Sequence, residues 1–238
     1  MRVSLHSCFI LHKRPYRETS FLLEVFSSEY GRISLVAKGV RKKKSNSQAL
    51  YQSHRNLSIA WSGRGEMGTL TAIEASGDDF NFQGEQVIAA FYLNELLMRL
   101  LHKHESHPVL YEEYLKALTR LSHGDSIQIA LRYFEKHLLI SLGYGLLLDH
   151  NVETGGGIQS DTQYYYSLEH GPYKNKPSTS DYVSISGHTL IGLEKELLRE
   201  DGALDEAKKL MRLALNTLLG DKPMASRDLY RAYLQQKQ

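Results

Sequence analysis

The chain has 238 residues, of which 42% are hydrophobic and 24% charged, with a net charge of +2; these values are ordinary for a folded globular protein with a real core. Its only cysteine, Cys8, excludes an intramolecular disulfide and a zinc site built from several thiolates, and it is typical of a reducing, cytoplasmic compartment. The N-terminus does not resemble a signal peptide, and no stretch has the roughly 20 apolar residues that cross a bilayer, so no membrane partner is expected.

The first 75 residues predict five short strands. Their β-favouring runs are separated by turn residues, and Pro15 ends the first run because proline lacks the N–H that a ladder needs. The predicted strands cover residues 3–11, 19–26, 32–40, 57–61 and 69–74. Five short strands with turns between them indicate a small closed barrel.

A cationic stretch lies within this predicted barrel. No Asp or Glu occurs between Glu29 and Glu66, so that window carries +8 and the rest of the chain sums to −6. Its basic residues are Arg32, Lys38, Arg41, Lys42, Lys43, Lys44, Arg55 and Arg64. An isolated basic run is often only a solvated loop, but this one continues a barrel strand, which favours contact with a phosphate backbone.

Aromatic residues share the same domain: Tyr16, Phe26, Tyr30, Tyr51 and Trp61. OB-type barrels bind single strands by combining a cationic groove with stacking side chains. Each aromatic taken singly is more typical of a core, but together with the charge pattern they predict nucleic-acid binding.

Beyond Gly84 the apolar spacing changes from two to three and four, which predicts helices. They are expected over residues 87–101, after Pro108, and over 126–142, 189–199, 204–219 and 226–234, with Ser226 as a cap of the last one. Residues 149–181 are irregular, apart from a strand-like run at 163–168, and a second strand-like run follows at 182–186. The predicted fold class is therefore α+β, with a β domain over residues 1–80 and a mainly helical domain over 81–238 that contains a small β insert at about 146–186.

No constellation indicates catalysis, a metal or a cofactor. His102, His104 and His107 lack the spacing of a metal site, and Cys8 lies in an apolar strand pattern typical of an inert buried thiol. The run of three glycines at 155–157 lacks the Lys and Ser or Thr of a phosphate-binding loop. The chain is therefore not expected to be an enzyme.

Arg132 is the candidate of the helical domain. It lies beside residues that its predicted helix buries, so its stem can pack on apolar surface while its guanidinium meets a carboxylate. That carboxylate is either Glu135, three residues further along the helix, or a group on a partner.

Several separated segments, in order, resemble the RecO family of bacterial recombination-mediator and DNA-repair proteins over nearly the full length. They are LHKRPYRETS at 11–20, GRISLVAKG at 31–39, YLNELL at 92–97, LRYFE at 131–135, LGYG at 142–145 and KPMASRDL at 222–229. The resemblance implies an N-terminal five-stranded OB-fold barrel, a helical C-terminal domain, binding of single- and double-stranded DNA, and annealing of complementary strands. It also implies work with RecR and, in some bacteria, RecF to load RecA onto DNA coated by single-stranded-DNA-binding protein.

The sequence departs from many relatives of that family in one respect. Those relatives carry four cysteines as a zinc-binding insert after the Leu-Gly-Tyr segment, whereas residues 149–181 contain none. The chain thus resembles the zinc-less, proteobacterial branch, and its insert must be held together by packing. For that branch the resemblance implies that the helical domain binds the acidic C-terminal tail of single-stranded-DNA-binding protein, with Arg132 as the residue expected to meet the tail.

The sequence therefore predicts a non-enzymatic, cytoplasmic and nucleoid-associated DNA-repair mediator. The residues expected to neutralise phosphates are Arg14, Arg17, Arg32, Lys38, Arg41, Lys42, Lys43, Lys44 and Arg55. Two alternatives stay open at this point: a protein-interaction scaffold whose basic loop contacts an acidic protein, and an RNA-binding OB protein without annealing activity.

Overall fold

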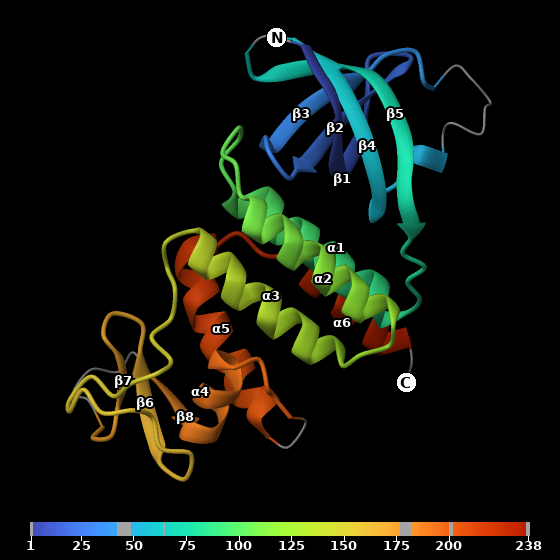
Figure 1. Cartoon of the computed structure of the whole chain (residues 1–238). Helices are drawn as coiled ribbons and strands as arrows, with labels where there is room; N and C mark the ends of the chain where they lie inside the picture. Colours follow the sequence, from blue (N-terminus) through green and yellow to red (C-terminus); the bar gives the residue numbers. More distant parts are fainter. Residues whose placement is uncertain (1, 42–48, 64, 177–181, 200–201, 237–238) are drawn as a thin grey trace. The chain divides into compact units, whose positions relative to one another are not determined.

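The computed structural model describes residues 2–41, 49–63, 65–176, 182–199 and 202–236 (Figure 1). Lys42, Lys43, Lys44 and Arg64, which belong to the cationic stretch, lie outside the described residues. The elements are β1 (Arg2–Tyr16), β2 (Ser20–Ser27), β3 (Gly31–Ala37), β4 (Arg55–Ser62), β5 (Met67–Asp79), α1 (Glu85–Leu100), α2 (Pro108–Ser122), α3 (Ile127–Ser141), β6 (Gln163–Ser167), β7 (Gly171–Tyr173), β8 (Val183–Ser186), α4 (Gly187–Glu194), α5 (Ala203–Leu219) and α6 (Ala225–Gln236). The α+β class and the five N-terminal strands are confirmed.

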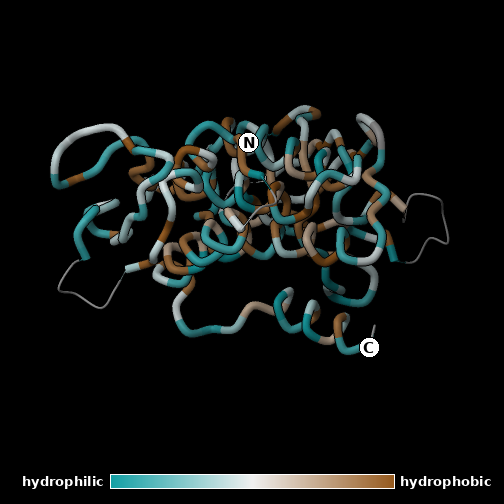
Figure 2. Tube along the Cα trace, turned by 90° about the horizontal axis from the view of Figure 1, so that it is seen from below, coloured by the Kyte–Doolittle hydropathy of each residue, from teal (hydrophilic) through white to brown (hydrophobic). Residues whose placement is uncertain are grey.

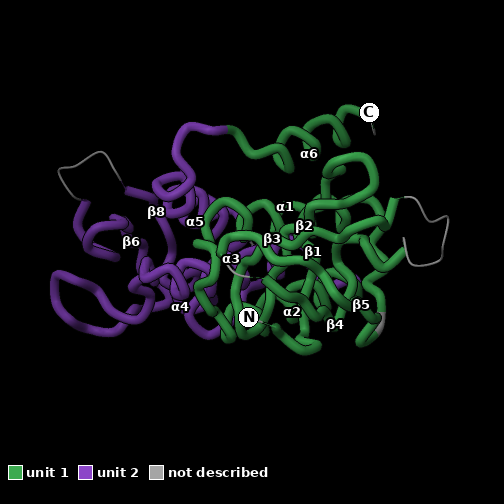
Figure 3. The backbone as a smooth tube through the Cα atoms, turned by 90° about the horizontal axis from the view of Figure 1, so that it is seen from above, with its two compact units in different colours: residues 1–123, 223–238 green, residues 124–222 purple. Residues whose placement is uncertain are grey.

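The chain forms two compact units (Figure 3). Unit 1 comprises residues 1–123 and 223–238, and unit 2 comprises residues 124–222. The first two helices and the last one thus belong with the strands. The sheet ends near residue 80, where the sequence analysis placed the domain boundary. That residues 1–80 form a domain of their own stays a prediction.

In unit 1 the strands pair in the order β1-β2-β3-β5-β4, and β1 pairs with both β2 and β4, so the sheet closes on itself. All pairings are antiparallel except that of β3 with β5. Alternate residues point inward and fill the interior, with Cys8, Leu35 and Ile59 at most 1% exposed. Burial raises the pKa of the Cys8 thiol to about 12, as expected of an inert thiol.

The first strand does not end before Pro15 as predicted but continues to Tyr16. Its pairing with β4 ends at Cys8, whereas its pairing with β2 continues through Pro15 and Tyr16. Over its second half β1 therefore has a partner on one side only, and the missing N–H of Pro15 is tolerated at this open edge.

The outer face of the sheet packs on the helices of unit 1 through a buried polar clamp. Asn94 of α1 donates its side-chain amide to the main-chain oxygen of Leu11 at 2.9 Å. It also accepts a 2.6 Å hydrogen bond from the Tyr114 hydroxyl of α2. Because both the nitrogen and the oxygen of this buried amide are hydrogen-bonded, the two helices are fixed to β1 without leaving an unsatisfied amide in the core.

The last helix, α6, packs on α1, and hydrophilic residues predominate along it (Figure 2). Ser226 is not its cap, contrary to the sequence prediction. The Glu95 carboxylate of α1 instead accepts the main-chain N–H groups of Ala225 and Ser226 at 2.8 and 2.9 Å and the Ser226 hydroxyl at 2.6 Å. Burial alone would raise the pKa of Glu95, but these hydrogen bonds lower it. The Glu95 carboxylate, and not the predicted serine, therefore caps the N-terminus of α6.

In unit 2 the predicted insert is a three-stranded sheet in the order β7-β6-β8, of which β7 was not predicted. Tyr164 and Tyr166 of β6 point into its core and are almost fully buried. The Glu153 carboxylate accepts the N–H groups of Lys174 and Asn175 and the Asn175 side-chain amide at 2.7 to 3.2 Å. Tyrosine packing and one carboxylate thus stabilise this segment, which contains no cysteine.

Candidate nucleic-acid interface

Four exposed cations lie at one end of the closed sheet of unit 1. Arg14 and Arg17 belong to the end of β1 and the turn after it, and Lys38 and Arg41 follow β3. Register brings these segments together, because Tyr16 pairs with Ser20 and Phe21 pairs with Ala37. We call the four side chains the cationic end.

Main-chain contacts fix the two turns of the cationic end against each other. The N–H of Arg41 donates to the main-chain oxygen of Thr19 at 2.9 Å, and the Arg41 guanidinium donates to that of Arg17 at 3.1 Å. Arg17 has a φ of +50°, and Gly39 has a φ of +73° with open space around it. These contacts thus hold against each other the two turns that carry the positive charges.

Lys13 was not among the predicted site residues, although it is exposed two residues before Pro15. Its ammonium lies 5.5 Å from the centre of the Phe21 ring, and the Arg17 guanidinium lies 5.3 Å from that of Tyr16. The alternation of β1 is the signal that would have found Lys13, had the strand been extended past residue 11. Half-buried rings beside cations are the combination that single-strand-binding barrels use.

Arg32 is not free to contact a phosphate. Its Nη1 lies 3.3 Å from Glu24 Oε2, and its Nε donates to the main-chain oxygen of Leu101, just after α1, at 3.1 Å. Ser34 donates to the other Glu24 oxygen at 2.7 Å. The side chain of Arg32 is half-buried and joins β3 to β2 and to the end of α1.

Arg55 also has partners within the fold. It forms a two-pronged ion pair with Asp79, with Nε donating to Oδ1 at 2.6 Å, and its Nη1 donates to the main-chain oxygen of Ala49 at 2.7 Å. It therefore fastens the beginning of β4 to the end of β5. Glu24 and Asp79 both lie outside the acid-free window, so counting charges along the chain did not find them.

Of the aromatic residues, three lie in the core of unit 1: Phe26, Tyr51 and Trp61 are between 0% and 8% exposed. Tyr16 and Tyr30 are half-buried. Tyr16 lies at the cationic end, whereas Tyr30 precedes β3 at its other end. The two more exposed rings, Tyr16 and Tyr30, thus lie at opposite ends of β3.

In unit 2, Arg132 of α3 is only 5% exposed. Its Nη2 donates to Glu135 Oε1 at 2.7 Å, and its Nε lies 2.7 Å from Glu135 Oε2. This confirms that Glu135 is a partner within the helix. Among the described residues Arg132 Nη1 has no hydrogen-bond partner. The expected contact of Arg132 with a partner's tail stays a prediction. In that contact the tail would meet a guanidinium whose Nη2 and Nε already face Glu135.

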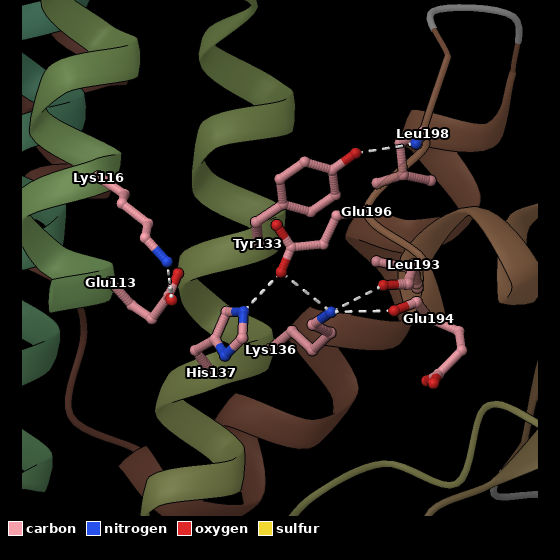
Figure 4. Close-up of polar contacts among 9 residues, drawn as sticks. All are labelled: Glu113, Lys116, Tyr133, Lys136, His137, Leu193, Glu194, Glu196 and Leu198. Atoms are coloured by element: carbon pink, nitrogen blue, oxygen red, sulfur yellow. Dashed lines mark hydrogen bonds and ion pairs between the residues drawn. The ribbon is translucent and has the colours of Figure 1, made fainter. Parts of the chain in front are cut away.

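Next along α3, Lys136 and His137 point toward the Glu196 carboxylate (Figure 4). Lys136 Nζ lies 3.2 Å from Glu196 Oε1 and donates to the main-chain oxygens of Leu193 and Glu194 at 3.0 and 3.3 Å. His137 Nε2 lies 2.5 Å from the same carboxylate oxygen. The ammonium thus satisfies carbonyls at the C-terminus of α4, where a positive charge is stabilised.

The hydrogen bonds from Lys136 to the Leu193 and Glu194 oxygens explain why α4 ends at Glu194 and does not continue to residue 199 as predicted. Glu196 has a φ of +55°, and the Tyr133 hydroxyl accepts the Leu198 N–H at 2.9 Å. Burial alone would raise the pKa of Glu196, but the hydrogen bonds from His137 and Lys136 outweigh it and lower the pKa to about 2. The sequence analysis missed this cluster because its members lie about 60 residues apart.

Within the described residues, no helix is both long and apolar enough to cross a membrane.

Two family models match the chain. The model described as recombination protein O N terminal matches residues 1–77, and the one described as recombination protein O C terminal matches residues 81–228. They meet close to the boundary predicted from the sequence.

Curated relatives named DNA repair protein RecO match over nearly the full chain. The protein from Nitrosococcus oceani is 44% identical over 96% of this chain and 93% of its own length. The protein from Ralstonia nicotianae is 38% identical over 96% of this chain and 84% of its own length. The protein from Aliivibrio fischeri is 36% identical over 97% of this chain and 96% of its own length.

Proposed function

Because the chain belongs to the RecO family of DNA repair proteins, we propose that it is a recombination mediator whose cationic end binds the phosphates of single- and double-stranded DNA. One observation carries this proposal. Arg14, Arg17, Lys38 and Arg41 are exposed at one end of the sheet, where main-chain hydrogen bonds hold the two turns together. Charges that a fold keeps close together and exposed are arranged for an anionic ligand.

The closed sheet supports an OB-fold as the scaffold. Its strand order is β1-β2-β3-β5-β4, β1 pairs on both sides, and β3 and β5 close the ring in parallel. Small five-stranded barrels of this kind bind oligonucleotides on the face of strands 2 and 3 and through the loops that join strands 1 and 2 and strands 4 and 5. The turn between β1 and β2, which carries Arg17 of the cationic end, corresponds to the first of these loops.

Annealing of complementary strands follows from neutralised phosphates, because pairing two strands requires that their repulsion be lowered. The proposal includes RecR and, in some bacteria, RecF as partners in loading RecA, and the tail of single-stranded-DNA-binding protein as a ligand of the helical part near Arg132. It assigns the protein no catalytic step and places its work in the cytoplasm, at the nucleoid. Family membership and the chemistry of a buried arginine support these parts.

The decisive experiment is a salt titration of DNA binding by the full chain and by a variant with Arg14, Arg17, Lys38 and Arg41 all replaced by Gln. Each phosphate contact on single strands contributes about 0.7 to the slope of log affinity against log salt, so the variant should lose about 3 units of slope and much of its affinity. Annealing of complementary oligonucleotides, with and without single-stranded-DNA-binding protein, should be slowed in parallel. An unchanged slope contradicts the proposal, and a preference for RNA over DNA oligonucleotides favours an RNA-binding protein.

A further inference from the structure

A cavity of about 300 Å³ lies in unit 1 beside the seam between β3 and β5. The seam is short, because only residues 34–36 of β3 pair with residues 67–69 of β5. Before it, the main chain at Lys103 and His104 takes the place of β5, with the His104 N–H donating to the Arg32 oxygen at 2.9 Å. The cavity is the space left between this segment and the beginning of β5.

Aromatic rings form one wall of the cavity. Tyr30 and Trp61 both line it and meet edge to face, with ring centres 5.0 Å apart. Gly68 lets the wall pack closely, because a Cβ there would lie 2.8 Å from Leu35 Cδ2 and 3.1 Å from Trp61 Cδ1. The remaining lining residues are Ile33, Ser34, Leu35, Gly63, Gly65 and His104. Aromatic and aliphatic side chains beside three glycines leave room for a flat, largely apolar ligand.

Charges of both signs flank the residues that line the cavity. Exposed carboxylates lie next to lining residues at Glu29, Glu66 and Glu105, and the exposed Lys103 lies next to His104. The described residues thus give the cavity no excess of positive charge, and its aromatic wall suits an uncharged ring. The cationic end, in contrast, follows the other end of β3. At about 3.3 Å per residue the seven-residue β3 spans roughly 20 Å, within reach of the roughly 4–16 nucleotides that one OB barrel binds.

We propose that this cavity holds one unstacked base of a single-stranded DNA whose phosphates are bound at the cationic end. The inference rests on the proposed function. The two rings are nearly perpendicular, so a base can stack on one of them and meet the other edge-on. Because a base held in this cavity cannot be paired, the cavity would make unit 1 prefer single strands over duplexes, which phosphate contacts alone do not.

The first test uses the chain without mutation, because Trp61 is its only tryptophan and reports directly on the cavity. The fluorescence of the full chain is followed during titration with an oligothymidylate of about 16 nucleotides, the upper end of the site size of one OB barrel, and with an abasic oligomer of the same length. The base-containing oligomer should quench Trp61 and bind about tenfold more tightly. Equal affinity and no quenching by either oligomer would overturn the proposal.

The second test compares Tyr30→Ser with Tyr30→Phe, which keeps the ring. Tyr30→Ser should weaken single-strand binding about tenfold, within the range measured when one base–aromatic stack is removed, whereas Tyr30→Phe should bind like the parent. The salt slope should not change in either variant. Tyr144→Ser, which removes an exposed tyrosine of unit 2, is the matched control and should bind like the parent.

The two tests separate failure of the cavity from failure of the proposed function. If Tyr30→Ser binds single strands like the parent and the salt slope still depends on the cationic end, the base site is wrong and DNA binding stands. If the quadruple Gln variant has an unchanged slope, the proposed function fails and the base site fails with it. If an aromatic peptide but no oligonucleotide quenches Trp61, the cavity serves a protein partner and the proposal is overturned.

Discussion

Arginine and lysine side chains occur both at the cationic end of unit 1 and in the α3–α4 segment of unit 2. They are exposed in the first region and buried with partners in the second. At the cationic end Arg14, Arg17 and Lys38 are exposed. In unit 2, Arg132 and Lys136 are buried and paired with carboxylates or helix carbonyls. A basic residue exposed near others serves a ligand, whereas one buried beside an acid stabilises the fold. Burial and partners therefore separate the two roles, and residue type does not.

The largest effect should come from breaking the buried pair in unit 2. Glu135→Ala leaves Arg132 as an unpaired charge in the core, so it should lower the free energy of unfolding by about 3–5 kcal/mol. Urea denaturation followed by far-UV circular dichroism measures this. Arg231→Ala is the matched control, because Arg231 pairs with Asp228 at the same i, i+3 spacing and 2.9 Å but on the surface. Arg231→Ala should lower the free energy of unfolding by about 0.2–0.5 kcal/mol. Similar losses in both variants would contradict the distinction between buried and exposed ion pairs.

The next prediction concerns Arg32, which belongs to the cationic stretch by sequence but is half-buried and paired with Glu24 in the structure. Arg32→Ala removes hydrogen bonds to Glu24 and to the Leu101 oxygen, and it should cost about 1.5–3 kcal/mol of stability. The salt slope of DNA binding should stay unchanged. Arg14→Ala should do the reverse, with little loss of stability and a slope lower by about 0.7 on single strands. A lower slope in Arg32→Ala would restore the sequence-based assignment.

The strand and helix positions could be predicted from the sequence, whereas the partners of individual arginines could not. The spacing of apolar residues places five strands and six helices close to their true positions among the described residues, because period two and period 3.6 are local properties. The family is confirmed as well, because two family models match residues 1–77 and 81–228. The partners of Arg32 and Arg55 are not local: Glu24 and Asp79 reach them through strand register. The extension of β1 through Pro15 and the cavity at the short β3–β5 seam also depend on which strand edges stay open.

A smaller effect should appear in the pH dependence of unit 2. The pKa of Glu196 is lowered from 4.5 to about 2, so its contribution to stability is fully present above about pH 5 and is lost as the pH falls toward 2. Glu196→Gln should remove this part of the acid sensitivity. Urea midpoints measured over that pH range give the difference between the two chains. Glu169→Gln is the control, because Glu169 is 84% exposed and its Oε2 lies 3.8 Å from His170 Nδ1. A parallel pH curve for Glu196→Gln and the parent would contradict the role of the cluster.

The smallest effect should come from Lys13, which extends the cationic end along β1. Its ammonium lies beside the Phe21 ring and stays exposed, so Lys13→Gln should leave stability unchanged. If the bound strand follows β1 and β2, the variant should lower the salt slope by about 0.7 and weaken binding a few-fold for any sequence, as the loss of one phosphate contact does. Lys195→Gln, at an exposed position of unit 2, should change neither value. An unchanged slope in Lys13→Gln would confine phosphate binding to the two turns, and the strand would then approach the sheet from the β3 side, where the cavity lies.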